Sequence, residues 1–299
     1  MVTGGAGFIG KHLVAKFLRA QHEITIFDNF SSSSKNDITY LLEDGVSLVT
    51  GDVLDYDLLL KSMSSCDFVI HLAAQTSVSQ SIADPKTTAD IIVDGTVNVL
   101  KSCVKANVKN IIFSSSAAVY GNSLDTLISE KSHLNPLSSY GASKLVAEYN
   151  LQTFSKLFDL NCISLRLFNV YGNGQSSEAG VIRKFLKNIS KETPLEIFGD
   201  GTQTRDFVHV SDVIRAFYCA IKNIEAKRGE VYNIGSGSAT SINELASLLI
   251  SSKEKDLQVI HKPALEGEIK DSKADISLAK NDIGYSPQIL LSDGLASLV

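Results

Sequence analysis

The sequence has few residues that could form a disulfide framework or a metal centre. It contains four cysteines in 299 residues, and they are far apart, form no CxxC pair and lie in apolar surroundings. This spacing indicates reduced core thiols in a cytoplasmic protein rather than disulfides or a zinc site. The six histidines also lack the spacing of metal ligands, so we expect no bound metal. The cysteines are Cys66, Cys103, Cys162 and Cys219.

Charge and hydropathy exclude two further classes of protein. The formal net charge is -5 and no basic run is present, so the chain has no electrostatic footprint for nucleic acid or for an anionic membrane. No apolar run approaches the roughly 18 residues of a membrane span, and the amino-terminal segment lacks the basic start and cleavage site of a secretory signal. We therefore expect a soluble, cytoplasmic protein that holds any anion by local groups.

Along the first half of the chain, short β-rich runs alternate with longer helical patterns. This alternation predicts a parallel sheet covered by helices, an α/β architecture of the Rossmann-type, doubly wound class. Between the third and fourth runs, Val93, Val97, Leu100 and Val104 recur at helical spacing, which predicts a helix that packs on the sheet through this stripe. The predicted strands are 23–28, 46–50, 67–73, 110–116 and 162–168.

The pattern becomes less regular after residue 169, where polar loops separate the remaining elements. We predict a Rossmann domain over 1–168 and a smaller substrate-binding α/β domain over 169–299, with the segment near 205–235 as a candidate to return to the first domain. The helices expected in this half lie near 180–190, 211–222 and 241–250.

A glycine-rich motif, "TGGAGFIG", stands at residues 3–10. Gly4, Gly7 and Gly10 allow a strand to turn sharply into a helix and the backbone to approach a pyrophosphate at the helix N-terminus. A tight structural turn is the alternative. The second predicted strand ends at Asp28, where a carboxylate would accept hydrogen bonds from ribose hydroxyls and repel a 2'-phosphate. The motif therefore favours NAD over NADP.

Two details near this motif leave alternatives open. Asp52 follows the next strand, where it is placed either to meet the adenine edge or to cap a helix. Only Met1 and Val2 precede Thr3, so the first strand is shorter than the usual five or six residues. Either the chain start is trimmed or this strand is held mainly by its neighbours.

The stretch "SSYGASKLV" places Tyr140 and Lys144 one helical turn apart on one face. A phenol is a poor base at neutral pH, but a nearby ammonium and a positively charged nicotinamide ring both favour the phenolate. Lowering the phenol pKa by about three units requires roughly 4 kcal/mol. Ser114, Ser115 and Ser116 end a predicted strand, where a hydroxyl could share the proton. A solvated helix face and serines that merely turn the chain are the alternatives.

Taken in order, ten motifs make the chain similar to the NAD-dependent epimerase/dehydratase family of extended short-chain dehydrogenases/reductases, and within it to UDP-glucose 4-epimerases. The similarity covers nearly the full length. The motifs are "TGGAGFIG", "IFDNFSSS", "GDVLD", "VIHLAAQTSV", "FSSSAAVYG", "YGASK", "LRLFNVYG", "FGDGTQTRDFVHVSD", "VYNIGSG" and "DSKADISLA".

The resemblance implies a role for each matching residue. Tyr140 matches the catalytic base, Lys144 the lysine that binds the cofactor ribose and lowers the base's pKa, and Ser116 the active-site hydroxyl. Asn169 and Arg205 match residues that hold the sugar-nucleotide diphosphate; guanidinium suits phosphate, with a salt bridge to Asp206 as the alternative. NAD would be held by Gly4, Gly7, Phe8, Ile9, Asp28, Asn29, Asp52, Val53, Ala73 and Ala74, together with Tyr140 and Lys144.

Residues beside the catalytic set separate the subfamilies. Related dehydratases and decarboxylases carry acidic residues just after the active-site hydroxyl, whereas Ala117 and Ala118 stand there in this chain. A methyl group cannot transfer a proton, so the expected reaction is NAD-dependent 4-epimerisation of a UDP-hexose through a 4-keto intermediate. Another sugar-nucleotide-modifying activity (4,6-dehydratase, decarboxylase or reductase) and a non-catalytic NAD-binding protein are the alternatives.

The substrate side departs from the family at one position. Leu265 replaces the usual phosphate-binding arginine, and Lys262 or Arg183 are candidates to compensate. Ser272 matches a gate beside the sugar ring, where a small side chain admits N-acetylated hexoses and a tyrosine excludes them. The resemblance also implies a homodimer formed by the helices around 86–106 and 138–158.

Overall fold

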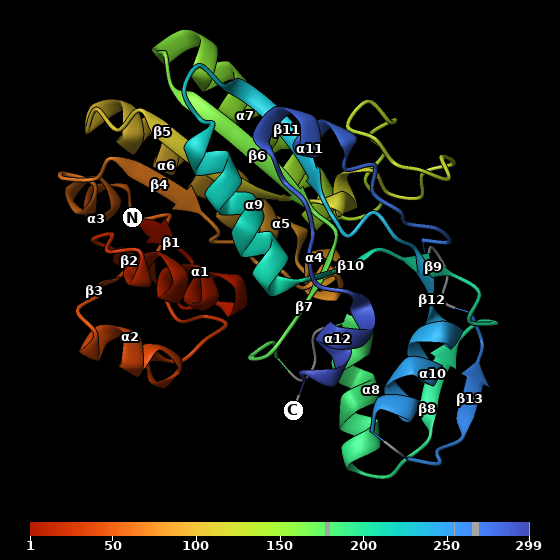
Figure 1. Ribbon diagram of the computed structural model, residues 1–299. Coiled ribbons are helices and arrows are strands. Elements are labelled where there is room, and N and C mark those ends of the chain that lie inside the picture. The colour runs from red at the N-terminus through yellow and green to blue at the C-terminus, as the bar shows by residue number, and fades with distance from the viewer. Residues whose placement is uncertain (177–179, 254, 265–268, 299) are drawn as a thin grey trace.

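A seven-stranded parallel sheet forms the centre of the protein in the computed structural model (Figure 1), which describes residues 1–176, 180–253, 255–264 and 269–298. The strand order is β11-β6-β5-β4-β1-β2-β3, and every neighbouring pair is parallel. The predicted fold class is confirmed. The strands are β1 (Val2–Thr3), β2 (Thr25–Asp28), β3 (Ser47–Thr50), β4 (Phe68–His71), β5 (Asn110–Ser116), β6 (Asn161–Leu167) and β11 (Arg228–Ile234).

Strand β1 has two residues and lies inside the sheet, between β4 and β2. Val2 pairs with Ile26 of β2 on one side and with Ile70 of β4 on the other. The short strand is therefore paired on both sides. At the far edge, β11 pairs along β6, so part of the 205–235 segment lies in the main sheet. The domain boundary at residue 168 stays a prediction.

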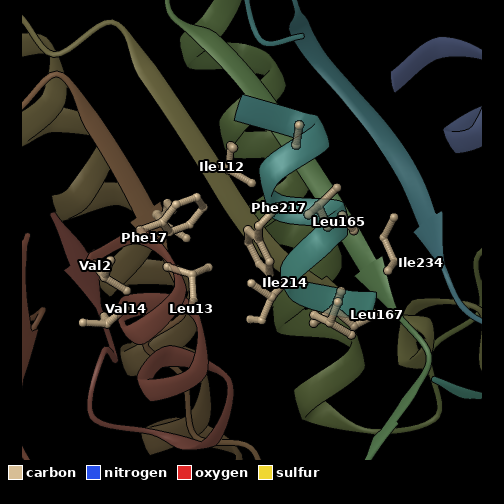
Figure 2. Packing of buried hydrophobic residues seen from close by; sticks show 14 of the residues in the cluster. Val2, Leu13, Val14, Phe17, Ile112, Leu165, Leu167, Ile214, Phe217 and Ile234 are labelled. Carbon is tan, nitrogen blue, oxygen red and sulfur yellow. The ribbon is translucent and has the colours of Figure 1, made fainter. Parts of the chain in front are cut away.

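Helices α1 (Phe8–Arg19) and α9 (Val210–Lys222) cover one face of the sheet. Their apolar side chains meet alternate residues of the strands, because successive strand residues point to opposite faces. Figure 2 shows Leu13 and Phe17 of α1 and Phe217 of α9 among the strand residues of this core. The opposite face is covered by α3 (Tyr56–Ser62), α6 (Gly95–Lys105) and α7 (Ser139–Phe158).

The predicted helix between β4 and β5 is present, but the predicted stripe is partly wrong. Leu100 is fully buried, whereas Val93, Val97 and Val104 are only partly buried. A π-helical turn, Asp90–Asp94, precedes α6, and its wider turn rotates the side chains relative to α-helical spacing. The buried face is made by Ile92, Thr96, Val99, Leu100 and Cys103.

A second core lies beyond the carboxyl edge of the sheet, at the lower right of Figure 1. It contains α8 (Gly180–Ser190) and α10 (Ile242–Ser252), which confirm two predicted helices, as α9 confirms the third. Around it are α12 (Leu291–Ala296) and three small sheets: β8 (Leu195–Phe198) with β13 (Val259–Lys262), β7 (Asn169–Tyr171) with β10 (Phe207–His209), and β9 (Thr204–Arg205) with β12 (Thr240–Ser241).

Short helices complete the chain, and the four cysteines are all free thiols. No helix in the described ranges has the length and apolar character that a membrane crossing requires. The remaining elements are η1 (Lys35–Ile38), α2 (Thr39–Glu43), α4 (Val78–Ala83), α5 (Pro85–Ala89), η3 (Ala117–Val119) and α11 (Ser277–Ile283).

Candidate active site

The predicted site residues gather at one edge of the main sheet. All the central strands are parallel, so their carboxyl ends lie at the same edge, and the strand order reverses between β1 and β4. Ligands of open α/β sheets bind at such a reversal. Gly4 follows β1, Asp28 ends β2, Asp52 and Ala73 lie two residues beyond β3 and β4, and Ser116 ends β5.

The glycine motif is shaped by close backbone approach. Gly4 has a φ of 67°, and a Cβ there would lie 2.7 Å from the Ala73 backbone nitrogen. A Cβ at Gly10 would overlap the Gly4 carbonyl oxygen. Helix α1 begins after Gly7, and no described side chain caps its N-terminus. This backbone cradle and the amides of the first helical turn, at Phe8 and Ile9, fit the pyrophosphate of a dinucleotide.

Asp28 also holds the glycine motif in shape. Its Oδ2 accepts a hydrogen bond from the Ala6 amide at 2.9 Å, and its Oδ1 accepts one from the Phe30 amide at 2.8 Å. The side chain is nearly buried, at 8% exposure. The sequence predicted only a contact with ribose; the bracing of the loop depends on the pairing of β1 with β2 and was not foreseen.

Beside Asp28, a second carboxylate lies close to the predicted adenine position. The Asn29 side chain donates to Asp52 Oδ2 at 2.8 Å. The capping alternative for Asp52 is wrong, because Asp55 caps α3. Val53 is buried against Gly95, and Ala73 and Ala74 are half-buried beside β4. These residues line the side of the edge that the resemblance assigns to NAD.

Tyr140, Lys144 and Ser116 come together where α7 crosses the end of β5. The Tyr140 phenol lies beside the Ser116 hydroxyl, which acts to lower the pKa of the phenol. Lys144 is 2% exposed, and its Nζ donates to the Ser114 carbonyl oxygen at 2.7 Å. The same Nζ lies 5.8 Å from the centroid of the Tyr140 ring and 4.6 Å from that of Phe113. The sequence spacing therefore predicted a real cluster.

Burial governs the protonation of this cluster. It raises the pKa of Tyr140 above its ordinary value, and the nearby Ser116 hydroxyl acts in the opposite direction. Burial lowers the pKa of Lys144 from 10.5 to about 7, while the charge of Glu148 raises it. The protein groups thus shift the phenol away from the lowered pKa that catalysis was expected to need. A lowered pKa requires further positive charge, and an oxidised nicotinamide ring would supply it.

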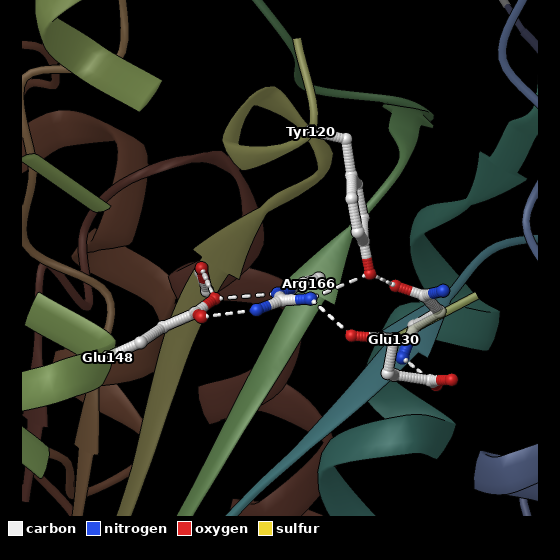
Figure 3. Close-up of polar contacts among 6 residues, drawn as sticks. Tyr120, Glu130, Glu148 and Arg166 are labelled. Carbon is white, nitrogen blue, oxygen red and sulfur yellow. Dashed lines mark hydrogen bonds and ion pairs between the residues drawn. The ribbon is translucent and has the colours of Figure 1, made fainter. Parts of the chain in front are cut away.

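Sequence reasoning missed a buried polar network next to these residues. Arg166 of β6 and Glu148 of α7 form an ion pair, with Nε to Oε1 at 2.9 Å and Nη2 to Oε2 at 2.7 Å. Figure 3 shows Arg166 between Glu148 and Tyr120, whose hydroxyl accepts from Arg166 at 2.8 Å. The available signal was an arginine within the apolar strand run "CISLRLF", since a charge that faces a core must be paired.

His71 forms a second buried polar cluster beneath the site. It is fully buried at the end of β4, with Nδ1 2.7 Å from Thr3 Oγ1 and Nε2 3.1 Å from Thr96 Oγ1. Burial, with the nearby charge of Lys144, lowers the pKa of His71 from 6.5 to about 3. The imidazole is therefore neutral, and it joins the first strand, the fourth strand and α6 beneath the edge.

The predicted substrate residues lie on the other side of Ser116. Asn169 is exposed at the start of β7, which continues from β6. The Arg205 guanidinium donates to the carbonyl oxygens of Thr204 at 2.7 Å and Lys270 at 3.5 Å. Asp206 is fully buried and accepts from Ser236, Gly237 and Ala274.

Ser272 is buried, at 6% exposure, in a segment tied to the loop that follows Ser116. The Ile128 amide donates to the Lys273 carbonyl, and Asn122 accepts from the Lys270 amide. The segment that carries the predicted gate is therefore joined to the loop after Ser116 by hydrogen bonds at Ile128 and Asn122. Lys262 is exposed, with an ion pair to Glu196 at 3.3 Å. Arg183 is half-buried on α8. Leu265 lies outside the described residues.

An edge of this kind, with a dinucleotide cradle beside a Ser-Tyr-Lys cluster, defines a class of NAD-dependent enzymes. The sequence profile described as "NAD dependent epimerase/dehydratase family" matches residues 1–235. The chain belongs to this family.

Three relatives illustrate the similarity over nearly the whole length. A UDP-glucose 4-epimerase of Mycolicibacterium smegmatis is 35% identical, with 100% of this chain and 96% of the relative covered. The crystal structure of UDP-glucose 4-epimerase from Thermotoga maritima with UDP-glucose has a TM-score of 0.93 at 34% identity and covers 99% of this chain and 95% of that one. A UDP-N-acetylglucosamine 4-epimerase from Methanobrevibacter ruminantium, in complex with UDP-N-acetylmuramic acid, has a TM-score of 0.93 at 33% identity, with coverage of 99% and 94%.

Proposed function

We propose that the protein is an NAD-dependent epimerase that inverts C4 of a UDP-hexose. The observation that carries the proposal is the convergence of Ser116, Tyr140 and Lys144 beside the glycine cradle. The relatives named above are 4-epimerases of UDP-sugars. NAD, when bound, supplies the oxidant for the sugar carbinol and the reductant for its return.

Tyr140 holds the proton of the reaction. As phenolate it takes the proton of the sugar 4-hydroxyl, and as phenol it gives the proton back after the 4-keto sugar has turned its other face. Ser116 lies beside the phenol and shares this proton. Lys144, buried behind the phenol ring, provides the cationic support that favours the phenolate.

The residues after Ser116 favour epimerisation over elimination. Ala117 and Ala118 form the start of η3, and the Ser116 hydroxyl accepts a hydrogen bond from the Ala118 amide at 3.1 Å. Two methyl groups thus stand where an elimination would need a carboxyl group. We assign Asn169 and Arg205 to the diphosphate and Ser272 to the wall beside the sugar.

We further infer a homodimer formed through α6 and α7, in the cytoplasm. Four apolar side chains of α7 are at least 43% exposed, which is a large unpartnered apolar surface for one helix. They are Val146, Tyr149, Leu157 and Phe158. Sedimentation velocity at micromolar concentration tests this inference, because a monomer would contradict it. The cytoplasmic location rests on the four free thiols.

Incubation with UDP-glucose, UDP-galactose and their N-acetyl counterparts, followed by separation of the products, tests the proposed function. We expect interconversion of at least one C4 pair with no net change in NADH. Loss of mass from the substrate would show a dehydratase or decarboxylase, and no turnover of any of the four would reject the sugar-nucleotide assignment. Denaturation of the purified protein should release NAD.

A further inference from the structure

We propose that the Glu148–Arg166 ion pair positions the catalytic residues. The inference rests on the proposed function, since it assigns Tyr140, Lys144 and Ser116 to catalysis. Glu148 and Arg166 touch neither the phenol nor the sugar-facing hydroxyl in the described contacts, so they act through the elements that carry them.

Glu148 lies on the helix face that carries the catalytic pair. Residues 140, 144 and 148 follow one another at four-residue spacing along α7 and therefore share one face. Each of these side chains contacts a different one of the last three residues of β5. Tyr140 contacts the Ser116 hydroxyl, Lys144 donates to the Ser114 carbonyl oxygen, and Glu148 accepts a short hydrogen bond from the Ser115 hydroxyl. The serine run thus forms a ladder of contacts with the helix.

Arg166 joins both sides of this ladder. On one side its guanidinium makes a two-pronged contact with Glu148 of α7. On the other side it donates to Tyr120, which closes the short helix after Ser116, and to the Glu130 carbonyl oxygen at 3.3 Å (Figure 3). Tyr120 in turn donates to Asn233 of β11 at 2.6 Å. One buried cation therefore fixes the helix that carries the base and the segment that follows the hydroxyl.

Because both side chains are buried, losing either partner of this ion pair is costly in free energy. The side chains of Arg166 and Glu148 are 4% and 1% exposed. A buried charge left without its partner has a high free energy, so the pair imposes one relative placement on α7 and β6. A two-pronged guanidinium-carboxylate contact also fixes orientation, which a lysine could not do equally well.

The pair also affects the charge beside the base. The titratable groups that face Lys144 are Glu148 and Tyr140 on its own helix and His71 on β4, with Arg166 of β6 behind Glu148. Among these, Glu148 is the group whose charge favours the ammonium form of Lys144. Removing that carboxylate would take away the charge that favours the ammonium and leave the Arg166 guanidinium without its carboxylate, so Lys144 would lose its proton more readily.

Glu148→Gln in the NAD-loaded protein tests the proposal. The variant keeps the shape of the side chain and removes its charge. We expect the phenol of Tyr140, titrated by its ultraviolet phenolate absorbance against Tyr140→Phe as the blank, to move up by about one pKa unit. At neutral pH kcat should then fall about tenfold, with KM for the UDP-sugar changed less than twofold. Glu148→Asp keeps the charge, so it should bring the pKa of the phenol part of the way back to the wild-type value.

The matched control is Asp212→Asn. Asp212 is 1% exposed and is bound to the Gln288 and Ile289 amides and to Arg215, away from α7. Its replacement should lower the melting temperature without moving the phenol titration. A Glu148→Gln protein that shows the same pattern as this control would overturn the proposal.

If Glu148→Gln does not fold, Arg166→Lys and Ser115→Ala carry the test. Both keep every charge and remove part of the contact. A smaller upward shift of the phenol pKa is expected for each, and an unchanged titration in both would reject the positioning role. The titration needs NAD but no sugar. The two hypotheses can therefore fail separately. If the wild-type protein has no epimerase activity but the pKa of the phenol still shifts in these variants, the proposed function is rejected and the positioning role is kept.

Discussion

The two halves of the sheet's carboxyl edge are built from different groups, backbone in one half and side chains in the other. Around β1 and β2 the site is made of backbone: glycine Cα atoms in close contact, helix amides that no described side chain caps, and a carboxylate that braces the loop. Around β5 and β6 it is made of buried polar side chains, with Lys144, Glu148 and Arg166 all under 5% exposed. The first half suits a ligand that stays bound, whereas the second suits a proton that must move.

Replacing Tyr140 with Phe should separate the two halves most sharply. The variant loses the base but keeps the ring, so we expect kcat to fall by about 10²–10⁴ while the NAD content stays at one per chain. Turnover with UDP-sugars and NAD released on denaturation are the two measurements. Tyr149→Phe, at an exposed position of the same helix, serves as the control. Near-normal turnover in Tyr140→Phe would rule out the assigned base.

Replacing Gly4 with Ala tests the backbone half, because it adds a side chain to the glycine loop. The new Cβ would lie 2.7 Å from the Ala73 nitrogen at a φ of 67°, so the loop must move. We expect NAD content to fall at least about tenfold and stability to fall by about 3 kcal/mol. Gly284→Ala is the matched control, because Gly284 has a φ of 74° with open space around it. Strain at this φ should also lower the stability of Gly284→Ala, but that variant should keep its NAD. Equal NAD loss in both variants would show that strain, not the cradle, matters.

The motifs revealed the backbone half better than the side-chain half. A glycine loop depends on residues close together in sequence, so Gly4, Gly7 and Asp28 could be placed from spacing alone. The bracing of Ala6 by Asp28 and the Glu148–Arg166 pair depend on which strands are neighbours and which face each one turns to α7. One sequence does not encode that neighbourhood in any local pattern.

The strands were predictable for a related reason. Buried parallel strands are continuous apolar runs, and five were located within about two residues. Strand β1 could not show such a run, because it has two residues and derives its place from pairing on both sides. Part of the predicted stripe was misplaced because the π-helical turn, Asp90–Asp94, changes the offset between Val93 and the residues of α6.

His71 lies between the two halves of the edge, and the pH dependence of stability tests its contribution. Its pKa is about 3 in the folded protein and 6.5 ordinarily, so between these values the unfolded chain binds a proton that the folded protein does not. The contribution of His71 is therefore complete above pH 6.5 and is lost as the pH falls toward 3. We expect a slope of up to about 1.4 kcal/mol per pH unit.

Urea unfolding of the NAD-loaded protein at several values between about pH 4.5 and pH 6.5 measures this slope. His71→Gln should give a shallower curve than wild type, and His133→Gln, at an exposed position, should not. Parallel curves for wild type and His71→Gln would mean that the folded imidazole accepts a proton without penalty.

The smallest expected effect concerns the sugar pocket beyond the side-chain half. Ser272 is buried in the segment tied to the loop after Ser116, and under the proposed assignment a tyrosine there would occupy space beside the sugar ring. Ser272→Tyr should lower kcat/KM for UDP-N-acetylhexoses about tenfold relative to UDP-glucose, while Ser272→Ala should leave the ratio unchanged. Competition between the two substrates in one reaction measures the ratio directly. If both variants lose both substrates equally, the segment supports the fold near Ser116, and sugar size is selected by other residues.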